Sequence, residues 1–83
     1  MTKLDRLLAR LADVAGVQAY PSDANMVLVR VPDAKSAFDG MKQRGVLVKN
    51  VSGLHPLLAN CLRLTVGTPD ENQRMIEALK ASL

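Results

Sequence analysis

The spacing of hydrophobic residues predicts a helix and then a strand in the first part of the chain. Over residues 3–14 the apolar positions recur at helical spacing, and they are Leu4, Leu7, Leu8 and Leu11. Gly16 suits the C-terminal cap of this helix. Residues 20–25 read YPSDAN, which is typical of a turn, and residues 26–31 read MVLVRV, a β-branched run typical of a strand.

The second half of the chain predicts one more helix, two strands and a loop before its end. Asp33 is a natural N-cap for a helix that extends to Gly45. The predicted buried stripe of this helix is Ala34, Ala37, Phe38 and Met41. Short strands are predicted at 46–49 and 61–66, and the loop between them has room for one turn of helix.

The final helix has the clearest local signal in the sequence. Thr68 is placed as the N-cap, Pro69 occupies the first helical position, and Glu71 follows the cap by three residues. This arrangement predicts a capping box, in which two free backbone N–H groups are satisfied by the Thr and Glu side chains. The helix is predicted to bury Met75, Ile76 and Leu79, with Leu83 as a further candidate.

Together these elements predict an α+β fold, with a three-stranded sheet and helices packed on one face, formed by residues 1–83 as a single domain. A strand–helix–strand connection normally joins parallel strands. Strands 26–31 and 46–49 are therefore expected to be parallel, and strand 61–66 is the candidate for an antiparallel strand between them.

Strand alternation separates one arginine from the core. In strand 61–66, Leu62 and Leu64 share the face that the helices cover, so Arg63 lies on the opposite face. The same alternation directs Arg30 and Lys49 away from the helices. An apolar surface that carries several cations is typical of a face that docks against a partner and holds an anion, because guanidinium groups match carboxylate and phosphate oxygens.

A simpler interpretation of these three cations remains open. Arg30, Lys49 and Arg63 could be ordinary exposed charges on a sheet whose outer side is loosely apolar. Other polar candidates also have structural interpretations. His55 is a lone loop histidine, Cys61 is a small buried hydrophobe, and Asp23 and Asn25 are turn formers.

Composition limits the classes of protein that fit. Hydrophobic residues make up 48% of the chain and charged residues 23%, as in ordinary globular domains. The net charge of +3 is spread without a basic block, which permits an anionic ligand but lacks the basic stripe of nucleic-acid binders. The two aromatic residues, Tyr20 and Phe38, fall outside the predicted strands, so base stacking on the sheet is not expected.

The sequence also bears on the cellular setting. No apolar run approaches the roughly 18 residues that a membrane span needs, and the first residues do not resemble a signal peptide. The single cysteine, Cys61, cannot form an internal disulfide and has no metal-ligand neighbours. We therefore expect a cytoplasmic protein, with neither nucleic acid nor a membrane as its partner and with no metal.

Three stretches of the sequence carry a resemblance to a known family. YPSDANMVLVRV at 20–31, RGVLVKNVSG at 44–53 and NCLRLTVGTPDEN at 60–72 resemble the C-terminal small domain of histidinol-phosphate aminotransferases. These enzymes are fold type I aminotransferases that depend on pyridoxal 5'-phosphate (PLP). The resemblance extends over the whole chain.

The resemblance implies roles for three residues. Arg63 falls on the arginine that binds the distal anion of the substrate, which is the phosphate of histidinol phosphate in this branch. Lys49 falls on or near a second phosphate-binding arginine, and here the sequence departs from the family because lysine lacks the bidentate fork. Asn25 is implied to lie near the active-site cleft.

For the complete protein the resemblance implies transfer of an amino group between histidinol phosphate and 2-oxoglutarate in histidine biosynthesis. It also implies a homodimer and a large domain of the same polypeptide, which holds PLP and supplies the Schiff-base lysine. We therefore expect no catalytic residue in this chain and no activity from it alone. The alternative is a self-standing α+β module that binds an anion or a partner through the same sheet face.

Overall fold

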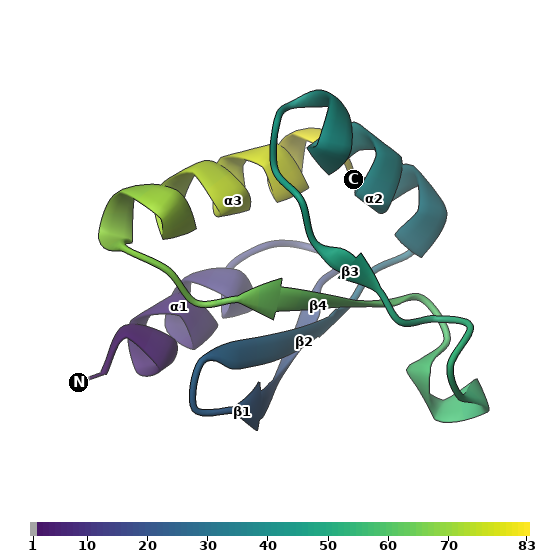
Figure 1. Cartoon of the computed structure of the whole chain (residues 1–83), viewed down its shortest axis with the longest axis horizontal. Coiled ribbons are helices and arrows are strands. Elements are labelled where there is room, and N and C mark those ends of the chain that lie inside the picture. The colour runs from purple at the N-terminus through teal and green to yellow at the C-terminus, as the bar shows by residue number, and fades with distance from the viewer. Residues whose placement is uncertain (1) are drawn as a thin grey trace.

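Three helices and four strands follow one another in the computed structural model, which describes residues 2–83 (Figure 1). Their order along the chain is α1 (Lys3–Ala12), β1 (Gln18–Asp23), β2 (Met26–Arg30), α2 (Ala34–Gln43), β3 (Lys49–Asn50), the short 3-10 helix η1 (Pro56–Leu58), β4 (Cys61–Thr65) and α3 (Pro69–Ala81). This is an α+β fold, as the sequence predicts.

The sheet has the strand order β1-β2-β4-β3, and each neighbouring pair is antiparallel. Because β4 is antiparallel to both β2 and β3, those two strands are parallel to each other with β4 between them. The predicted arrangement of the three expected strands is therefore confirmed. The predicted number of strands is wrong, because β1 adds a fourth.

The additional strand, β1, covers residues whose composition had predicted a turn. Its residues are mostly exposed, so it shows no alternation of apolar and polar positions. Pro21 fits in this strand because β1 is at the edge of the sheet, where a missing N–H is tolerated. The turn itself is confined to Ala24 and Asn25, and the pairing shifts between Pro21 and Asp23.

Strand β3 is shorter than the prediction of 46–49, and the end of α2 explains the difference. Gly45, at φ 79°, donates its N–H to the carbonyl of Lys42 at 3.0 Å, and Val46 donates to Met41 at 2.9 Å. This pair of bonds is a Schellman cap. The N–H of Val46 is thus used by the helix, and regular pairing begins only at Lys49.

The starts of the helices are set by local capping. The predicted box of α3 is present, since Thr68 Oγ1 accepts from the Glu71 N–H at 3.2 Å and Glu71 Oε1 accepts from the Thr68 N–H at 2.9 Å. These bonds hold the pKa of Glu71 below its ordinary value. Helix α1 has a second box, formed by Thr2 and Asp5.

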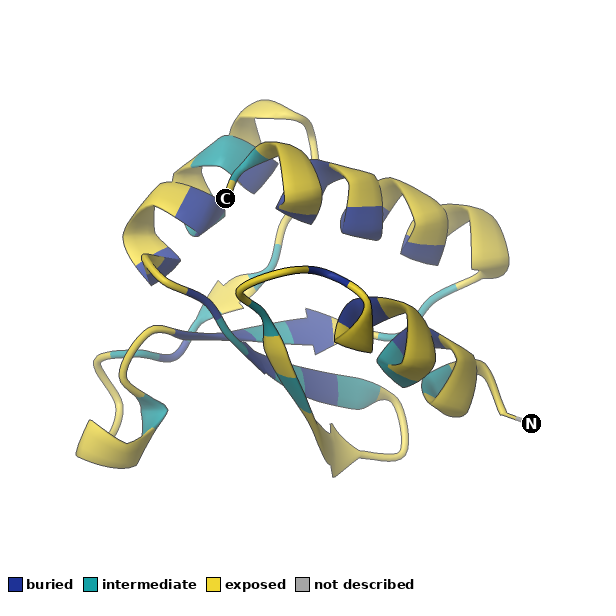
Figure 2. Cartoon of the chain, turned by 180° about the vertical axis from the view of Figure 1, so that it is seen from behind, coloured by how far each residue is buried: buried dark blue, intermediate teal, exposed yellow. Residues whose placement is uncertain are grey.

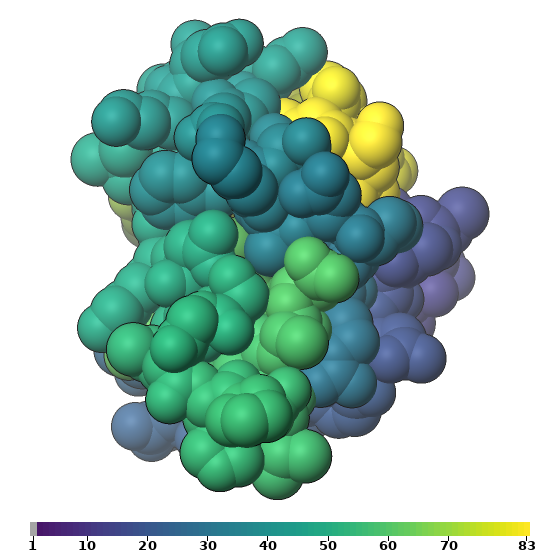
Figure 3. All heavy atoms as spheres, turned by 90° about the vertical axis from the view of Figure 1, so that its right-hand side faces the viewer, coloured from purple at the N-terminus to yellow at the C-terminus, as the bar shows by residue number. Residues whose placement is uncertain are grey.

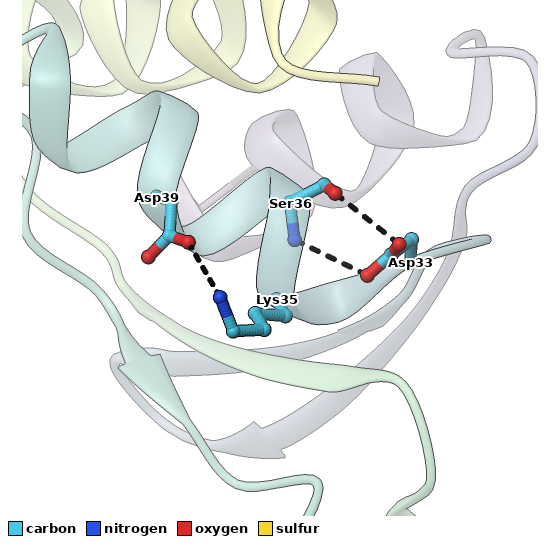
Figure 4. Close-up of polar contacts among 4 residues, drawn as sticks. All are labelled: Asp33, Lys35, Ser36 and Asp39. Carbon is cyan, nitrogen blue, oxygen red and sulfur yellow. Dashed lines mark hydrogen bonds and ion pairs between the residues drawn. The ribbon is translucent and has the colours of Figure 1, made fainter.

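Helix α2 begins at the predicted N-cap. Asp33 accepts from the backbone N–H and the hydroxyl of Ser36, both at 3.2 Å, and Lys35 pairs with Asp39 at 3.3 Å one turn along the helix (Figure 4). Helix α1 ends earlier than predicted, because its C-cap is Asp13 rather than Gly16.

The helices cover one face of the sheet, and the core lies between the two layers (Figure 2). Side chains with no exposed area come from both layers, and they include Leu11, Ala37, Met41 and Leu79 from the helices and Val27, Val29, Leu62 and Leu64 from the strands. Leu83 remains 49% exposed, so its predicted burial is wrong. Among the described residues, no helix is long and apolar enough to cross a membrane.

Candidate functional site

Strand β4 presents Arg63 on the face of the sheet opposite the helices. Its neighbours in the strand, Leu62 and Leu64, are fully buried in the core, while Arg63 is half-buried. Because successive side chains in a strand point to opposite faces, the guanidinium lies on the outer face of the sheet. We define this outer face by the residues that share it across β2, β4 and β3: Leu28, Arg63 and Lys49.

Pairing of the strands places Lys49 directly beside Arg63. The two residues face each other across β3 and β4, and Leu28 of β2 faces Arg63 from the other side. Neighbouring strands are about 4.8 Å apart, so both side chains rise from nearly the same point on the outer face. Lys49 is exposed, which leaves its ammonium group accessible.

No carboxylate compensates these two charges. Strands β2, β3 and β4 contain no Asp or Glu, and in residues 2–83 the one ion pair joins Lys35 to Asp39 on α2. Within the same residues, neither Arg63 nor Lys49 has a side-chain hydrogen bond to the protein. Like charges directly opposite each other destabilise a sheet. An anion bound between the two side chains would remove this repulsion.

The third predicted cation, Arg30, is used differently. Its Nε donates to the carbonyl of Ala59 at 3.3 Å, and its Nη2 donates to the carbonyl of Leu57 at 2.5 Å. Arg30 does point away from the helices, as predicted. However, its guanidinium binds the loop that follows β3, so the outer face has two available cations rather than the expected three.

Asn25 lies apart from the two cations. It is exposed in the turn between β1 and β2, and its carbonyl accepts from the N–H of Val66 at 2.8 Å. Arg63 faces Leu28, three residues further along β2. At about 3.3 Å per residue, the separation along the strand is about 10 Å. The structure therefore brings Arg63 and Lys49 together but leaves Asn25 at one end of the sheet.

Tyr20 belongs to the same row of residues, and sequence reasoning did not place it there. It faces Leu28 from β1, is 45% exposed, and donates its hydroxyl to Gln18 Oε1 at 3.0 Å. The expectation that no aromatic residue falls in a strand is therefore wrong. The turn directly before β2 was a usable signal, because a tight turn before a strand often closes a hairpin.

The remaining polar candidates have structural roles. His55 Nδ1 accepts from the N–H of Leu57 at 3.0 Å and so caps η1. Cys61 is 2% exposed, as expected of a small buried hydrophobe. Within the described part of the chain, no group of three or more His, Cys, Asp or Glu residues could hold a metal ion.

A cleft of about 280 Å³ lies away from the two cations. It is formed between the α2–β3 connection and α3, and its lining includes Leu47, Thr65, Glu71 and Arg74. Neither Arg63 nor Lys49 contributes to it. These two cations are on an open sheet surface, so a closed binding site would need further protein to cover the outer face.

Comparison with known proteins assigns the chain to a family. The sequence profile described as aminotransferase class I and II matches residues 1–79. A protein of Methylibium petroleiphilum named histidinol-phosphate aminotransferase is 72% identical over 78 residues, which are 94% of this chain and 21% of that protein. The chain thus spans about a fifth of the length of this curated relative.

Two solved structures share the fold. The histidinol-phosphate aminotransferase of Clostridium acetobutylicum superposes with a TM-score of 0.85 at 17% identity, over 95% of this chain and 25% of that one. The L-threonine-O-3-phosphate decarboxylase of Porphyromonas gingivalis superposes with a TM-score of 0.82 at 25% identity, over 93% of this chain and 25% of that one. With the profile matching nearly the whole sequence, this chain belongs to the class I and II aminotransferase family.

Proposed function

We propose that this chain is the C-terminal small domain of a longer PLP-dependent aminotransferase, and that its outer face binds the phosphate group of the substrate. The observation that carries the proposal is the position of Arg63 beside Lys49, with no ion pair to a carboxylate at either residue within residues 2–83. In this proposal Arg63 supplies a planar fork that matches two phosphate oxygens, and Lys49 adds a second charge.

The names of similar proteins favour phosphate over carboxylate as the anion. The Methylibium relative is named for histidinol phosphate, and the Porphyromonas structure is named for L-threonine-O-3-phosphate. Both named molecules are phosphate esters that also carry an amino group. On this basis the substrate of the complete protein is histidinol phosphate, with 2-oxoglutarate as the second substrate, and the pathway is histidine biosynthesis.

The residues of this chain do not fit covalent attachment of the cofactor. A lysine that forms a Schiff base is activated by desolvation in an apolar pocket or by a neighbouring cation. The five lysines here are all exposed, and they are Lys3, Lys35, Lys42, Lys49 and Lys80. Lys49 does lie beside a cation, Arg63, but the proposal assigns its charge to the phosphate of the substrate. We therefore assign PLP, which supplies an electron sink when bound, to a large domain of the same polypeptide.

In the complete protein, Arg63 and Lys49 contribute by positioning. By fixing the phosphate end of the substrate, they would hold its amine at the reacting centre and reduce the entropy lost on reaching the transition state. Further parts of the proposal are a homodimeric enzyme and a place in the cytoplasm. Asn25 is proposed to lie at the border of the substrate cleft.

The test uses a complete enzyme in which this chain replaces the matching segment of the Methylibium relative. Arg63→Ala should lower kcat/KM for histidinol phosphate by a factor that corresponds to about 2 to 5 kcal/mol of activation free energy, as expected when one partner of a buried charge pair is removed. With histidinol, which lacks the phosphate, the same change should have little effect. Steady-state kinetics with both substrates measures the difference.

Arg74→Ala is a matched control, because Arg74 is an exposed arginine on α3 and lies in the helical layer. This variant should retain the preference for the phosphorylated substrate. Equal kinetics for the parent enzyme and Arg63→Ala with histidinol phosphate would contradict the anchoring role of Arg63.

A further inference from the structure

The two cations of the outer face lie on strands that differ in how many residue pairs hold them in the sheet. Arg63 is in the middle of β4, which pairs with β2 over five residue pairs. Lys49 is in β3, an edge strand with only two residue pairs, Lys49 with Arg63 and Asn50 with Leu62. So short a ladder specifies its register weakly, and a slip of one residue would turn Lys49 to the other face of the sheet.

Contacts of the loop that follows β3 extend this short ladder. The N–H of Val51 donates to the carbonyl of Cys61 at 3.2 Å, and both side chains are nearly fully buried. Asn50 Oδ1 accepts from the N–H of Ser52 at 3.0 Å. The loop then forms η1 and returns to β4, so any displacement of η1 is transmitted to β3 through a short, ordered segment.

The end of the loop is attached to β2 and α2. Asn60, at φ 57°, accepts from the N–H of Val31 at 2.9 Å through its carbonyl and from the N–H of Ala34 at 3.2 Å through its side chain. Figure 3 shows this side of the molecule, with the loop residues in teal and green beside the blue residues where β2 ends. These contacts hold the loop where it enters β4.

Arg30 holds the helical turn of the same loop. Its two hydrogen bonds go to Leu57, inside η1, and to Ala59, directly after it. A guanidinium at the C-terminal end of a helical turn satisfies carbonyls that have no partner within the turn. Arg30 therefore fastens the middle of the loop to β2, the strand that also supports Arg63.

We infer that Arg30 is a positioning residue that keeps Lys49 beside Arg63 by fastening the β3–β4 loop to β2. Without the Arg30 guanidinium, the carbonyls of Leu57 in η1 and Ala59 after it each lose a donor. The loop then becomes more mobile, and β3 frays from its two-residue ladder. Lys49 then leaves its place on the outer face, whereas Arg63 stays in position because β2 holds it. This inference rests on the proposed phosphate site but assigns a role to a residue that does not touch the phosphate.

Hydrogen exchange of the 83-residue chain tests the structural part. In Arg30→Gln, the amides of Val51 and Leu58 should exchange about ten-fold faster or more, which corresponds to losing a hydrogen bond from a charged donor. The amides of Leu62 and Leu64 in β4 should keep their protection. Faster exchange throughout β4 would overturn the inference, because Arg30 would then support the whole sheet.

Kinetics of the complete enzyme carrying this chain tests the functional part. The measured quantity is the ratio of kcat/KM for histidinol phosphate to kcat/KM for histidinol. Arg30→Gln should lower this ratio by about the same factor as Lys49→Gln, and the double variant should show no further loss, because residues that act through one another are not additive. Arg30→Lys, which retains one charged donor, should restore part of the ratio.

Arg44→Gln is the matched control for both measurements. Arg44 also donates from its guanidinium to a backbone carbonyl, that of Gly40 at 3.0 Å, but it is the C-cap of α2 and bonds to the last turns of that helix. This variant should leave the ratio and the exchange rates of the loop unchanged. If Arg63→Ala lowers the ratio while Arg30→Gln leaves it unchanged, the role of Arg30 is refuted and the phosphate site stands. If Arg63→Ala has no effect, the phosphate site itself is refuted.

Discussion

Arg63 and Lys49 have like charges directly opposite each other on neighbouring strands, an arrangement that disfavours the folded chain when no anion is present. Neither residue contributes to the hydrophobic core, since Arg63 is half-buried and Lys49 is exposed. In the proposed function, the two residues contribute by binding the phosphate of the substrate. At the scale of single residues, the proposed site would favour anion binding and lower the stability of the chain without a bound anion.

This trade-off predicts that removing one of the two charges stabilises the isolated chain. Lys49→Gln should raise the free energy of unfolding by about 0.5 kcal/mol at low ionic strength, because it removes the repulsion across β3 and β4. The gain should shrink in about 0.5 M salt, roughly three-fold above physiological ionic strength, because salt screens the repulsion between exposed charges. Urea unfolding followed by circular dichroism measures both values.

Lys42→Gln provides the contrast. Lys42 is an exposed lysine in the last turn of α2, where a positive charge is favourable to the helix. This variant should be slightly less stable than the parent chain at low salt. A stability gain of equal size in both lysine variants would show that net charge, rather than the pairing of Lys49 with Arg63, is responsible.

At the scale of elements, the end of α2 determines where β3 begins. The Schellman cap takes up the N–H of Val46, so the sheet gains only a two-residue strand from this segment. The cap depends on Gly45 at φ 79°, a backbone conformation that other residues adopt at a cost. One glycine thus influences both the length of the helix and the strand that presents Lys49.

Gly45→Ala should lower the free energy of unfolding by about 1 to 2 kcal/mol, the usual cost of a left-handed conformation for a residue with a Cβ atom. A Cβ atom at Gly45 would contact nothing within 4 Å, so steric overlap plays no part. The matched control is Gly53→Ala, where a Cβ atom also meets open space but φ is not in the left-handed region. Urea unfolding should show the loss in the first variant and no loss in the second.

The elements differ in how far the sequence could predict them. The start of α3 was predicted to the residue, because Thr68, Pro69 and Glu71 act through local hydrogen bonds. Strand β1 was missed because an exposed edge strand shows no alternation, and the composition of Pro21, Ser22 and Asp23 is that of a turn. The hydrophobic pattern could not show that the cap of α2 uses the backbone N–H of Val46, the first residue of the strand predicted at 46–49.

The candidate site was predictable only in part, because some of its features follow from local sequence and others depend on residues far apart in the chain. The face occupied by Arg63 followed from Leu62 and Leu64 on either side of it. The position of Lys49 opposite Arg63 depends on the register of two strands joined by a long loop, which alternation alone does not determine. The hydrogen bonds of Arg30 could not be predicted from the sequence pattern, because the carbonyl groups that accept them lie 27 and 29 residues away in the chain.

At the scale of the whole molecule, the helices cover one face of the sheet (Figure 2). The opposite face carries Arg63, which is half-buried, and Lys49, which is exposed. The chain also spans only about a fifth of the length of its Methylibium relative. Both facts agree with a proposal in which a large domain covers the outer face and holds PLP. The self-standing binding module, by contrast, would need to bind its ligand tightly on an open surface.

Reductive trapping distinguishes these interpretations of the whole molecule. Borohydride reduction of the isolated chain with PLP, followed by mass spectrometry of peptides, should give no stoichiometric adduct at a single site, because all five lysines are exposed and none is desolvated in an apolar pocket. An aminotransferase with a known Schiff-base lysine serves as the positive control. One adduct per chain at one lysine would contradict the assignment of the cofactor to a separate domain.

The proline in β1 affects how readily copies of this chain associate through their sheet edges in solution. Pro21 stands in the outermost strand of the sheet and has no hydrogen on its nitrogen, so it interrupts the row of donors along that border. A second copy that tried to extend the sheet there would find a gap in the ladder. The border is therefore a poor template for fibril growth, a protection that many exposed strand edges obtain in the same way.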